Sequence, residues 1–163
     1  FDYGTGKPSP LGMCIKNGII YGDYMTSYSV MAVKKDGTIY TPAQGLMGKN
    51  LLAAGVKDTY NFGPVLIKDG EAQLPWAETE KYYPRTAVGM VKPNDYVLLV
   101  TDTGSYNGLN HWDMVNIFKS YGCTYAYNLD GGGSATLYFN GKVMNKLIGN
   151  TQRPCADFLY FTR

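Results

Sequence analysis

The sequence contains few of the residues that most often bind metals or act as catalytic nucleophiles. Its 163 residues include three cysteines, Cys14, Cys123 and Cys155, and a single histidine, His111. No CxxC spacing occurs, so the sequence predicts no zinc site. No Ser-His-Asp or Cys-His arrangement can be argued from the spacing either. We expect no bound metal, and no other cofactor is indicated.

An odd number of cysteines leaves the redox state open. Cys14 and Cys123 lie in strand-like segments, where buried free thiols are more common than ligands. One disulfide together with one free thiol is the alternative. His111 is expected in the first turn of a helix, with its side chain exposed to solvent.

Long apolar runs and runs of one charge are also missing. Without an apolar run of membrane-spanning length, the chain is expected to have no membrane span. The net charge is only +2, and acidic and basic residues are interspersed, which argues against nucleic acid as a partner. Residues 1–163 are expected to form one domain, which is large enough to bury a core.

The most frequent local pattern is an Asn-Gly or Asp-Gly pair between short β-rich runs. Such pairs tolerate the positive φ angles that type I′ hairpin turns need. A further turn is predicted at Pro93-Asn94-Asp95. The four pairs are Asn17-Gly18, Asp36-Gly37, Asp69-Gly70 and Asn140-Gly141. These hairpins predict mostly antiparallel sheets.

One helix is clearly indicated between Asn110 and Gly122. Asn110 is the expected N-cap, Asp113 completes a capping box, and Gly122 ends the helix. A shorter helix is expected around Lys49 to Ala54. Strands are expected before and after the glycine run of residues 131–133, and again at the end of the chain. The core-facing residues predicted from helical spacing are Met114, Ile117, Phe118 and Tyr121. The fold class is therefore α+β: mostly antiparallel sheets built from hairpins, with a few flanking helices.

Three consecutive glycines stand between Asp130 and Ser134 in the stretch NLDGGGSATLYFNG. Glycine costs packing and chain entropy, but its bare backbone can approach a ligand closely. A bend of this kind exposes backbone N–H groups that suit an anion. No Gly-Lys-Ser/Thr and no helix follow, so a P-loop is a poor match. A flexible surface turn is the other interpretation.

A few charged residues outside this loop are also candidates for a site. Arginine occurs only as Arg85, Arg153 and Arg163. Arg85, with Thr86 beside it, begins a predicted strand, and a guanidinium there suits phosphate. A surface salt bridge is the alternative for both Arg85 and Arg153. Asp102 ends an apolar strand, where an acid can line a site or cap a turn.

The segments NLDGGGSATLYFNG, PRTAVG, FGPVLIKDG and GLNHWDM occur in the order that is typical of the phosphodiester glycosidase family. The chain resembles that family's catalytic domain from about Phe1 to Arg163. The family's early NxxFF motif is matched only by its end, in FDYG, so the chain is expected to begin inside that strand. Many members carry an arginine soon after the acid equivalent to Asp102, where this chain has Thr103-Gly104.

The resemblance implies packed antiparallel sheets and cleavage of a sugar 1-phosphodiester into free sugar and a phosphomonoester. It also implies a glycan or sugar-phosphate substrate and an extracytoplasmic, secreted or cell-surface location. Most members are bacterial. Asp130 is the first choice for the catalytic carboxylate and Asp102 the second. The remaining site residues that it implies are Arg85, Thr86, Asn128, Gly131, Gly132, Gly133, Ser134 and Arg153.

We hypothesise that Arg85 and the amides of Gly132, Gly133 and Ser134 hold the departing phosphate. A phosphate monoester leaves readily, so stabilising its charge matters more than protonating it. Two other functions are compatible with the same residues: a phosphoglycan-binding module without catalysis, and a structural domain at the cell surface. Tyr106, Trp112 and Tyr138 could stack on a sugar or simply pack.

Overall fold

The structure is a computed structural model that describes residues 9–24, 26–74, 81–102 and 107–161. Its α-helices are α1 (Gly48–Ala53) and α2 (His111–Ser120), and two short 3-10 helices are η2 (Gly132–Ser134) and η3 (Ile148–Asn150). The strands are β1 (Cys14–Lys16), β2 (Ile19–Gly22), β3 (Ser29–Lys34), β4 (Ile39–Tyr40), β5 (Val56–Phe62), β6 (Val65–Lys68), β7 (Glu71–Ala72), β8 (Thr86–Lys92), β9 (Asp95–Val100), β10 (Tyr125–Leu129), β11 (Tyr138–Phe139) and β12 (Lys142–Val143).

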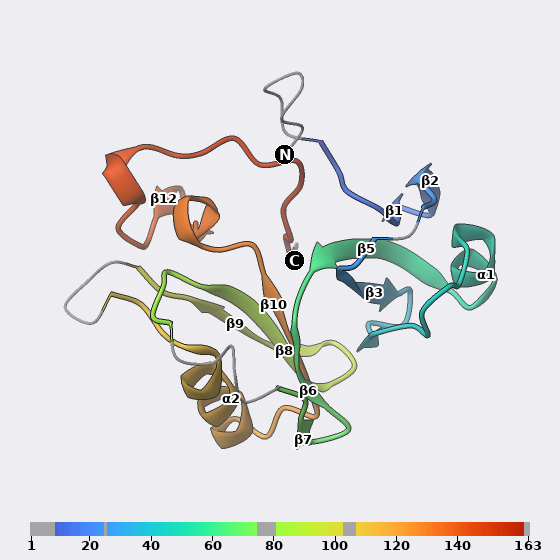
Figure 1. Cartoon of the computed structure of the whole chain (residues 1–163), viewed down its shortest axis with the longest axis horizontal. Coiled ribbons are helices and arrows are strands. Elements are labelled where there is room, and N and C mark those ends of the chain that lie inside the picture. The colour runs from blue at the N-terminus through green and yellow to red at the C-terminus, as the bar shows by residue number, and fades with distance from the viewer. Residues whose placement is uncertain (1–8, 25, 75–80, 103–106, 162–163) are drawn as a thin grey trace.

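Two main sheets organise the molecule (Figure 1). The larger sheet has the order β7-β6-β10-β8-β9, and the smaller one has the order β4-β3-β5. Every strand pair in the described part of the chain is antiparallel. The mostly antiparallel architecture predicted from the hairpins is confirmed, with two α-helices among the described residues and strands in the majority.

The two sheets share a core that contains buried tyrosines of the central strand β10. Tyr127 is fully buried, and its hydroxyl donates to the Ser29 carbonyl at 2.6 Å and accepts from the Phe62 amide at 2.8 Å. Tyr125 shares a 2.6 Å hydrogen bond with Thr41. Burial raises the pKa of both tyrosines, so the hydroxyls stay protonated. The core residues of this layer are Met31, Ile39, Tyr60, Val88, Met90, Tyr125 and Tyr127.

Helix α2 packs on the other face of the larger sheet. Its capping box is present as predicted: Asp113 N–H donates to the Asn110 side chain at 2.8 Å, and Asn110 N–H donates to the Asp113 carboxylate. Gly122 has φ of +74° and ends the helix, with the paired N–H bonds of a Schellman motif. The short helix predicted around Lys49 to Ala54 is α1.

Two predictions on α2 are wrong. His111 is buried at 8% exposure rather than exposed, because the first turn of the helix packs against the protein. Tyr121 is 63% exposed, because it is the C-cap residue, where the chain leaves the helical spiral before the aromatic ring can reach the core. Val115, which the spacing argument did not include, is buried in the core beside Met114 and Phe118.

The predicted hairpins all form. Positive φ occurs at both residues of the pairs Asn17-Gly18, Asp69-Gly70 and Asn140-Gly141, as type I′ turns require. The pair Asp36-Gly37 is different, because only its glycine has positive φ, and the Asp36 carboxylate instead accepts from the Thr38 amide at 2.9 Å. The turn at Pro93-Asn94-Asp95 joins β8 to β9.

The C-terminal part of the chain contains less strand than its composition predicts. The expected strand after the glycine run is reduced to the two residues of β11, in a hairpin with β12 that pairs with neither main sheet. The expected last strand is wrong: residues 151–161 contain no regular element. Side chains suited to a strand form one only where a neighbouring strand accepts their backbone hydrogen bonds.

All three cysteines are free, so the alternative with one disulfide does not occur. Cys14 and Cys123 are buried at 4% exposure, and burial raises the pKa of both thiols. Cys155 is exposed. No helix in the described part of the chain combines the length and the apolar character that crossing a membrane requires.

We predict that Asn110→Ala lowers the free energy of unfolding by about 1 kcal/mol, the usual cost of losing an N-cap. The substitution removes the acceptor of the Asp113 amide. Asn116→Ala is the matched control, because Asn116 lies exposed in the middle of the same helix and its loss should change stability by less than about 0.5 kcal/mol. Urea unfolding followed by circular dichroism measures both. Equal stability of the two variants would contradict the role of the cap.

Candidate functional site

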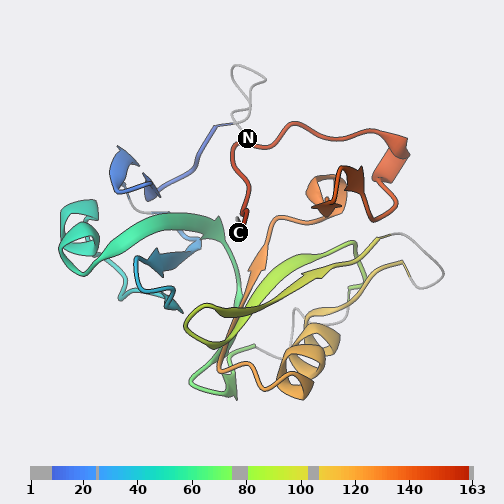
Figure 2. The same ribbon diagram turned by 180° about the vertical axis from the view of Figure 1, so that it is seen from behind.

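The predicted site residues lie where strands β8, β9 and β10 end on the same side of the larger sheet. Leu129, the last residue of β10, pairs with Thr86, the first residue of β8, and Thr86 also pairs with Val100, the last residue of β9. The Arg85 amide donates to the Thr101 hydroxyl at 2.9 Å. The antiparallel register therefore brings the starts and ends of three strands together. Figure 2 shows the chain leaving β10 at this side and continuing through η2.

The glycine run packs directly against the backbone that precedes β8. A Cβ atom at Gly131 would lie 2.4 Å from the Pro84 carbonyl oxygen, which no side chain can tolerate. The Gly132 amide donates to that same oxygen at 2.8 Å, and Gly132 has φ of +56°. A Cβ at Gly133 would meet only ordinary contacts with Arg153. Gly131 is thus needed for close approach and Gly132 for its backbone conformation.

Asp130, Ser134 and Arg153 form one connected polar cluster beside this loop. The Ser134 hydroxyl donates to Asp130 Oδ2 at 2.8 Å, and Arg153 Nη2 donates to the same oxygen at 2.5 Å. Arg153 Nη2 also contacts Ser134 Oγ. The Asp130 and Arg153 side chains are 48% and 49% exposed. A carboxylate, a hydroxyl and a guanidinium therefore meet at a position that solvent can reach.

The amide cradle that we predicted is only partly available in this structure. The Gly132 amide donates to Pro84, and the Ser134 amide donates to the Gly131 carbonyl at 2.9 Å, as in a short 3-10 turn. These two donors are satisfied within the chain. Two of the three amides that we expected to hold the phosphate are therefore already hydrogen-bonded within the chain. The reason is that the glycine run folds into a compact turn against its neighbour instead of remaining an open bend.

The Arg85 guanidinium binds backbone carbonyls of the chain itself. Its Nε donates to the Leu109 carbonyl at 3.1 Å and its Nη2 to the Lys81 carbonyl at 2.9 Å. Burial lowers the pKa of this guanidinium, which nevertheless remains charged at ordinary pH because the pKa of arginine is so high. It joins the segment before β8 to Leu109, two residues before α2. Arg153, rather than Arg85, is the arginine that contacts Asp130.

Asn128 and Thr86 are held inside the sheet. Asn128 is 1% exposed, and its side-chain amide donates to the Gly63 carbonyl at 2.7 Å. Its backbone groups also bond to Gly63 and Pro64. Two buried side-chain oxygens, Asn128 Oδ1 and Thr86 Oγ1, have no hydrogen-bond partner among the described residues. Asn128 thus fixes β10 against the Gly63-Pro64 turn and keeps one unused acceptor.

Asp102 lies at the same end of the sheet and accepts a hydrogen bond from the Lys146 amide at 2.8 Å. It ties the end of β9 to the segment after β12. Among the aromatic candidates, the Tyr138 side chain is 67% exposed. Trp112, on α2, is partly buried and packs against the core, and Tyr106 lies outside the described residues. No group of three or more His, Cys, Asp or Glu side chains suited to a metal occurs in the described ranges.

Sequence reasoning missed one structural feature next to the site, the bridge between Tyr83 and Leu109. Its two backbone hydrogen bonds hold the chain before Arg85 against the chain before α2. A Cβ at Gly108 would lie 1.9 Å from the Tyr83 carbonyl oxygen. The Asn107-Gly108 pair, with positive φ at both residues, was the signal that could have indicated a tight turn there.

Comparison with known proteins agrees with this architecture. A family model described as phosphodiester glycosidase matches residues 1–162. The SPbeta prophage-derived uncharacterized protein YomE of Bacillus subtilis is 31% identical over 160 residues, which cover 91% of this chain and 25% of that protein. The N-acetylglucosamine-1-phosphodiester alpha-N-acetylglucosaminidase of Mus musculus is 28% identical over 156 residues, covering 80% of this chain and 29% of that protein. The chain therefore spans only about a quarter of the length of these relatives.

Two solved structures share the fold. The catalytic domain of zebrafish N-acetylglucosamine-1-phosphodiester alpha-N-acetylglucosaminidase, auto-inhibited by its pro-peptide, superposes with a TM-score of 0.70 at 24% identity, covering 90% of this chain and 53% of that one. A hypothetical protein from Synechocystis superposes with a TM-score of 0.54 at 16% identity, covering 82% and 34%. With the family model matching nearly the whole chain, this protein belongs to the phosphodiester glycosidase family.

Proposed function

We propose that this chain hydrolyses the glycosidic bond of a sugar 1-phosphodiester and releases free sugar and a phosphomonoester. The observation that carries the proposal is the contact between Asp130 and Arg153 beside the glycine run. It combines the two groups that the reaction needs, a carboxylate for the sugar and a cation for the phosphate. Membership in the family and the named activity of the mouse relative support it.

The bond that breaks joins C1 of the sugar to the bridging phosphate oxygen. The electron pair of that bond leaves with the phosphate, and water supplies the hydroxyl that C1 gains and the proton that is released. The transition state resembles an oxocarbenium ion, which a carboxylate stabilises as nucleophile or as base for water. Asp130 takes that role in our proposal because its carboxylate is accessible and oriented by two donors.

Arg153 is the proposed phosphate-binding cation. Its guanidinium reaches Asp130 directly, so a phosphoryl group bound to it would lie next to the carboxylate. C1 is only one bridging oxygen away from that phosphorus. Charge-assisted donors aimed at the leaving phosphate are expected to contribute strongly to the rate. Arg85 supports the site indirectly by bracing the segment against which the glycine run packs.

The substrate is proposed to be a surface or exported glycan, and the protein is proposed to act outside the cytoplasm. N-acetylglucosamine 1-phosphodiesters are the first compounds to test, because the mouse and zebrafish proteins are named for that substrate. A panel that varies the sugar and the alcohol on the phosphate would define the specificity. Protein that binds these compounds without releasing sugar would instead be a phosphoglycan-binding module.

We predict that Asp130→Asn lowers the rate of sugar release by about 100- to 10,000-fold, the usual contribution of a catalytic acid or base. The fold should be retained, because the side chain is about half exposed and Asn can still accept from Ser134. Asp69→Asn is the control: this exposed turn residue has positive φ, which Asn tolerates. Near-normal turnover by Asp130→Asn would remove Asp130 from the mechanism.

The two arginines should behave differently when replaced by alanine. Arg153→Ala removes charge-assisted hydrogen bonds worth about 1.5–3 kcal/mol each, which corresponds to a roughly ten- to hundredfold rise in KM. Its effect on unfolding should be small because the side chain is exposed. Arg85→Ala should instead lower the unfolding midpoint, because it removes the two side-chain hydrogen bonds to the Leu109 and Lys81 carbonyls.

Steady-state kinetics and urea unfolding of both variants separate these effects. A raised KM with unchanged stability in Arg85→Ala, and the reverse in Arg153→Ala, would exchange the two assignments. If Arg85→Ala loses both stability and activity while Arg153→Ala keeps its stability, Arg85 acts by holding the segment before β8 in place.

A further inference from the structure

We propose that Lys16, on the N-terminal hairpin, is a positioning residue that holds Arg153 in the candidate site. It does so by fastening residues 151–161, here called the C-terminal strap, to strand β5. Figures 1 and 2 show the strap returning from the glycine-loop side of the molecule and passing the end of β5. The relevance of Lys16 to catalysis rests on the proposed function, whereas its effect on the strap does not.

The strap depends on side-chain contacts for its path. It contains no helix or strand, and no backbone–backbone hydrogen bond is formed by residues 151–161 within the described part of the chain. Arg153 contacts the site at one end, and Asp157 and the residues after it contact the body at the other. A segment without a hydrogen-bonded ladder opens easily unless such contacts fix it.

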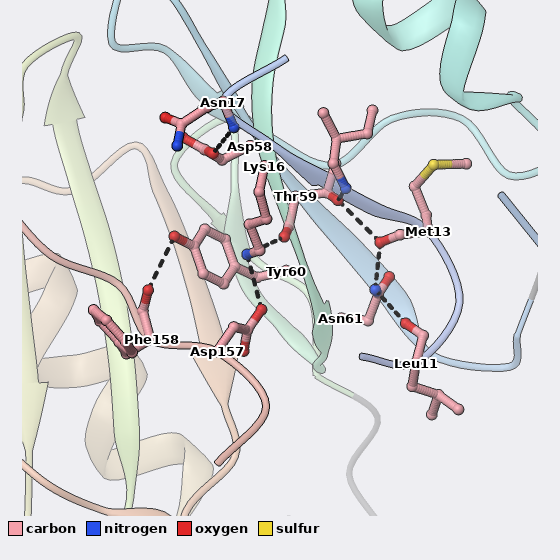
Figure 3. A network of polar contacts seen from close by, with 11 residues as sticks. Leu11, Met13, Lys16, Asn17, Asp58, Thr59, Tyr60, Asn61, Asp157 and Phe158 are labelled. Atoms are coloured by element: carbon pink, nitrogen blue, oxygen red, sulfur yellow. Dashed lines mark hydrogen bonds and ion pairs between the residues drawn. The ribbon is translucent and has the colours of Figure 1, made fainter. Parts of the chain in front are cut away.

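Lys16 forms the fastening at the second end. Its Nζ lies 2.8 Å from Asp157 Oδ2, donates to the Thr59 carbonyl at 2.8 Å and lies 3.4 Å from the centroid of the Tyr60 ring. These three contacts surround the ammonium group with a carboxylate, a carbonyl and an aromatic face (Figure 3). A cation so well coordinated is a stronger anchor than an isolated surface ion pair.

A second contact continues the fastening along the strap. The Tyr60 hydroxyl donates to the Phe158 carbonyl at 3.4 Å, and the next residue, Leu159, packs against the core between the sheets. Tyr60 itself is buried at 7% exposure, and burial raises the pKa of its hydroxyl, so it remains a donor. Lys16 on β1 and Tyr60 on β5 therefore hold two consecutive residues of the strap, Asp157 and Phe158.

The hairpin that carries Lys16 is itself fixed to β5. The Thr59 hydroxyl accepts from the Ile15 amide at 2.8 Å and donates to the Met13 carbonyl at 2.9 Å. On the other side of Lys16, the Asn17 amide donates to Asp58 at 2.8 Å (Figure 3). Because both neighbours of Lys16 are hydrogen-bonded to β5, its side chain presents a fixed anchor rather than a mobile charge.

The spacing along the strap transmits this anchor to the site. Asp157 follows Arg153 by four residues, so their Cα atoms can be at most about 14 Å apart. The Lys16–Asp157 pair is also less exposed, at 24% and 39%, than the Arg153–Asp130 pair. The inner pair is thus suited to permanent anchoring, while the outer pair can be exchanged for a phosphate in solvent. Release of Asp157 would allow Arg153 to leave the site.

The test uses the full chain with a trifluoromethyl ketone tag on Cys155, the exposed cysteine two residues after Arg153. Fluorine NMR linewidth reports the order of the strap, and titration with inorganic phosphate reports anion binding near Arg153. We expect Lys16→Met to narrow the resonance and to weaken phosphate binding at least about fivefold, the lower end of typical coupling between sites. Lys16→Arg should keep the linewidth and the phosphate affinity of the unsubstituted chain, because arginine keeps the charge and the contact with Tyr60.

Lys57→Met is the matched control. Lys57 is a neighbouring β5 lysine that is 49% exposed and pairs only loosely, at 3.9 Å, with Asp58. Lys57→Met should leave the linewidth of the Cys155 tag and the phosphate affinity unchanged. If Lys16→Met fails to fold, Asp157→Asn tests the same contact from the strap, where no core side chain is altered. The effect on KM should exceed the effect on kcat, because Lys16 does not touch the reacting atoms.

The outcomes separate this inference from the proposed function. Unchanged linewidth and phosphate affinity in Lys16→Met and Asp157→Asn would overturn the positioning role. If the unsubstituted chain releases no sugar from any substrate, the proposed function fails, but narrowing of the Cys155 tag in both variants would still support the fastening of the strap. A fall in thermal stability without any change at Cys155 would mark Lys16 as merely structural and would also overturn it.

Discussion

The register between β8 and β10 is the constraint on which the candidate site depends. Because Leu129 lies opposite Thr86, the chain leaves one strand at the point where it enters the other. The glycine run and the Pro84-Arg85 segment must then occupy neighbouring space. A shift of one residue would turn every side chain of β10 to the opposite face, exchanging the core tyrosines with the residues that face α2. Site geometry and core packing are therefore fixed by the same hydrogen-bond ladder.

Tyrosine has an important part in maintaining that register. The Tyr127 side chain reaches from the larger sheet to the smaller one. Its hydroxyl donates to the Ser29 carbonyl and accepts from the Phe62 amide, where β3 pairs with β5. A buried hydroxyl with two partners selects one strand register more strictly than an aliphatic side chain does, because a displaced strand would leave these polar groups unpaired. The burial of Tyr60, Tyr125 and Tyr127 in this layer thus has a structural explanation.

The two arginines illustrate how a fold assigns different roles to identical side chains. Arg85 directly precedes β8, and its guanidinium donates to two backbone carbonyls, those of Leu109 and Lys81. Arg153 comes from a segment with no regular structure and meets Asp130 and Ser134 in an exposed position. A guanidinium that binds substrate must be able to exchange partners, and the exposed one is better suited to that than the braced one.

Much of the local structure follows from the sequence, because it depends on short-range rules. The capping box of α2, the positive-φ hairpin turns and the mostly antiparallel sheets could be predicted from neighbouring residues alone. The motif around Asp130 also carried the resemblance to the family, and the family model agrees with that resemblance. In each case the deciding interactions join residues only a few positions apart.

Only the tertiary structure decided the rest. The burial of His111, the loss of the last predicted strand and the use of the loop amides within the chain all depend on which distant segment lies nearby. The same is true of the pairing of Arg153 with Asp130 and of Lys16 with Asp157, residues separated by most of the chain in the second case. A sequence lists the donors and acceptors available, but long-range packing determines which of them meet, because each buried polar group takes the partner that the register brings within reach.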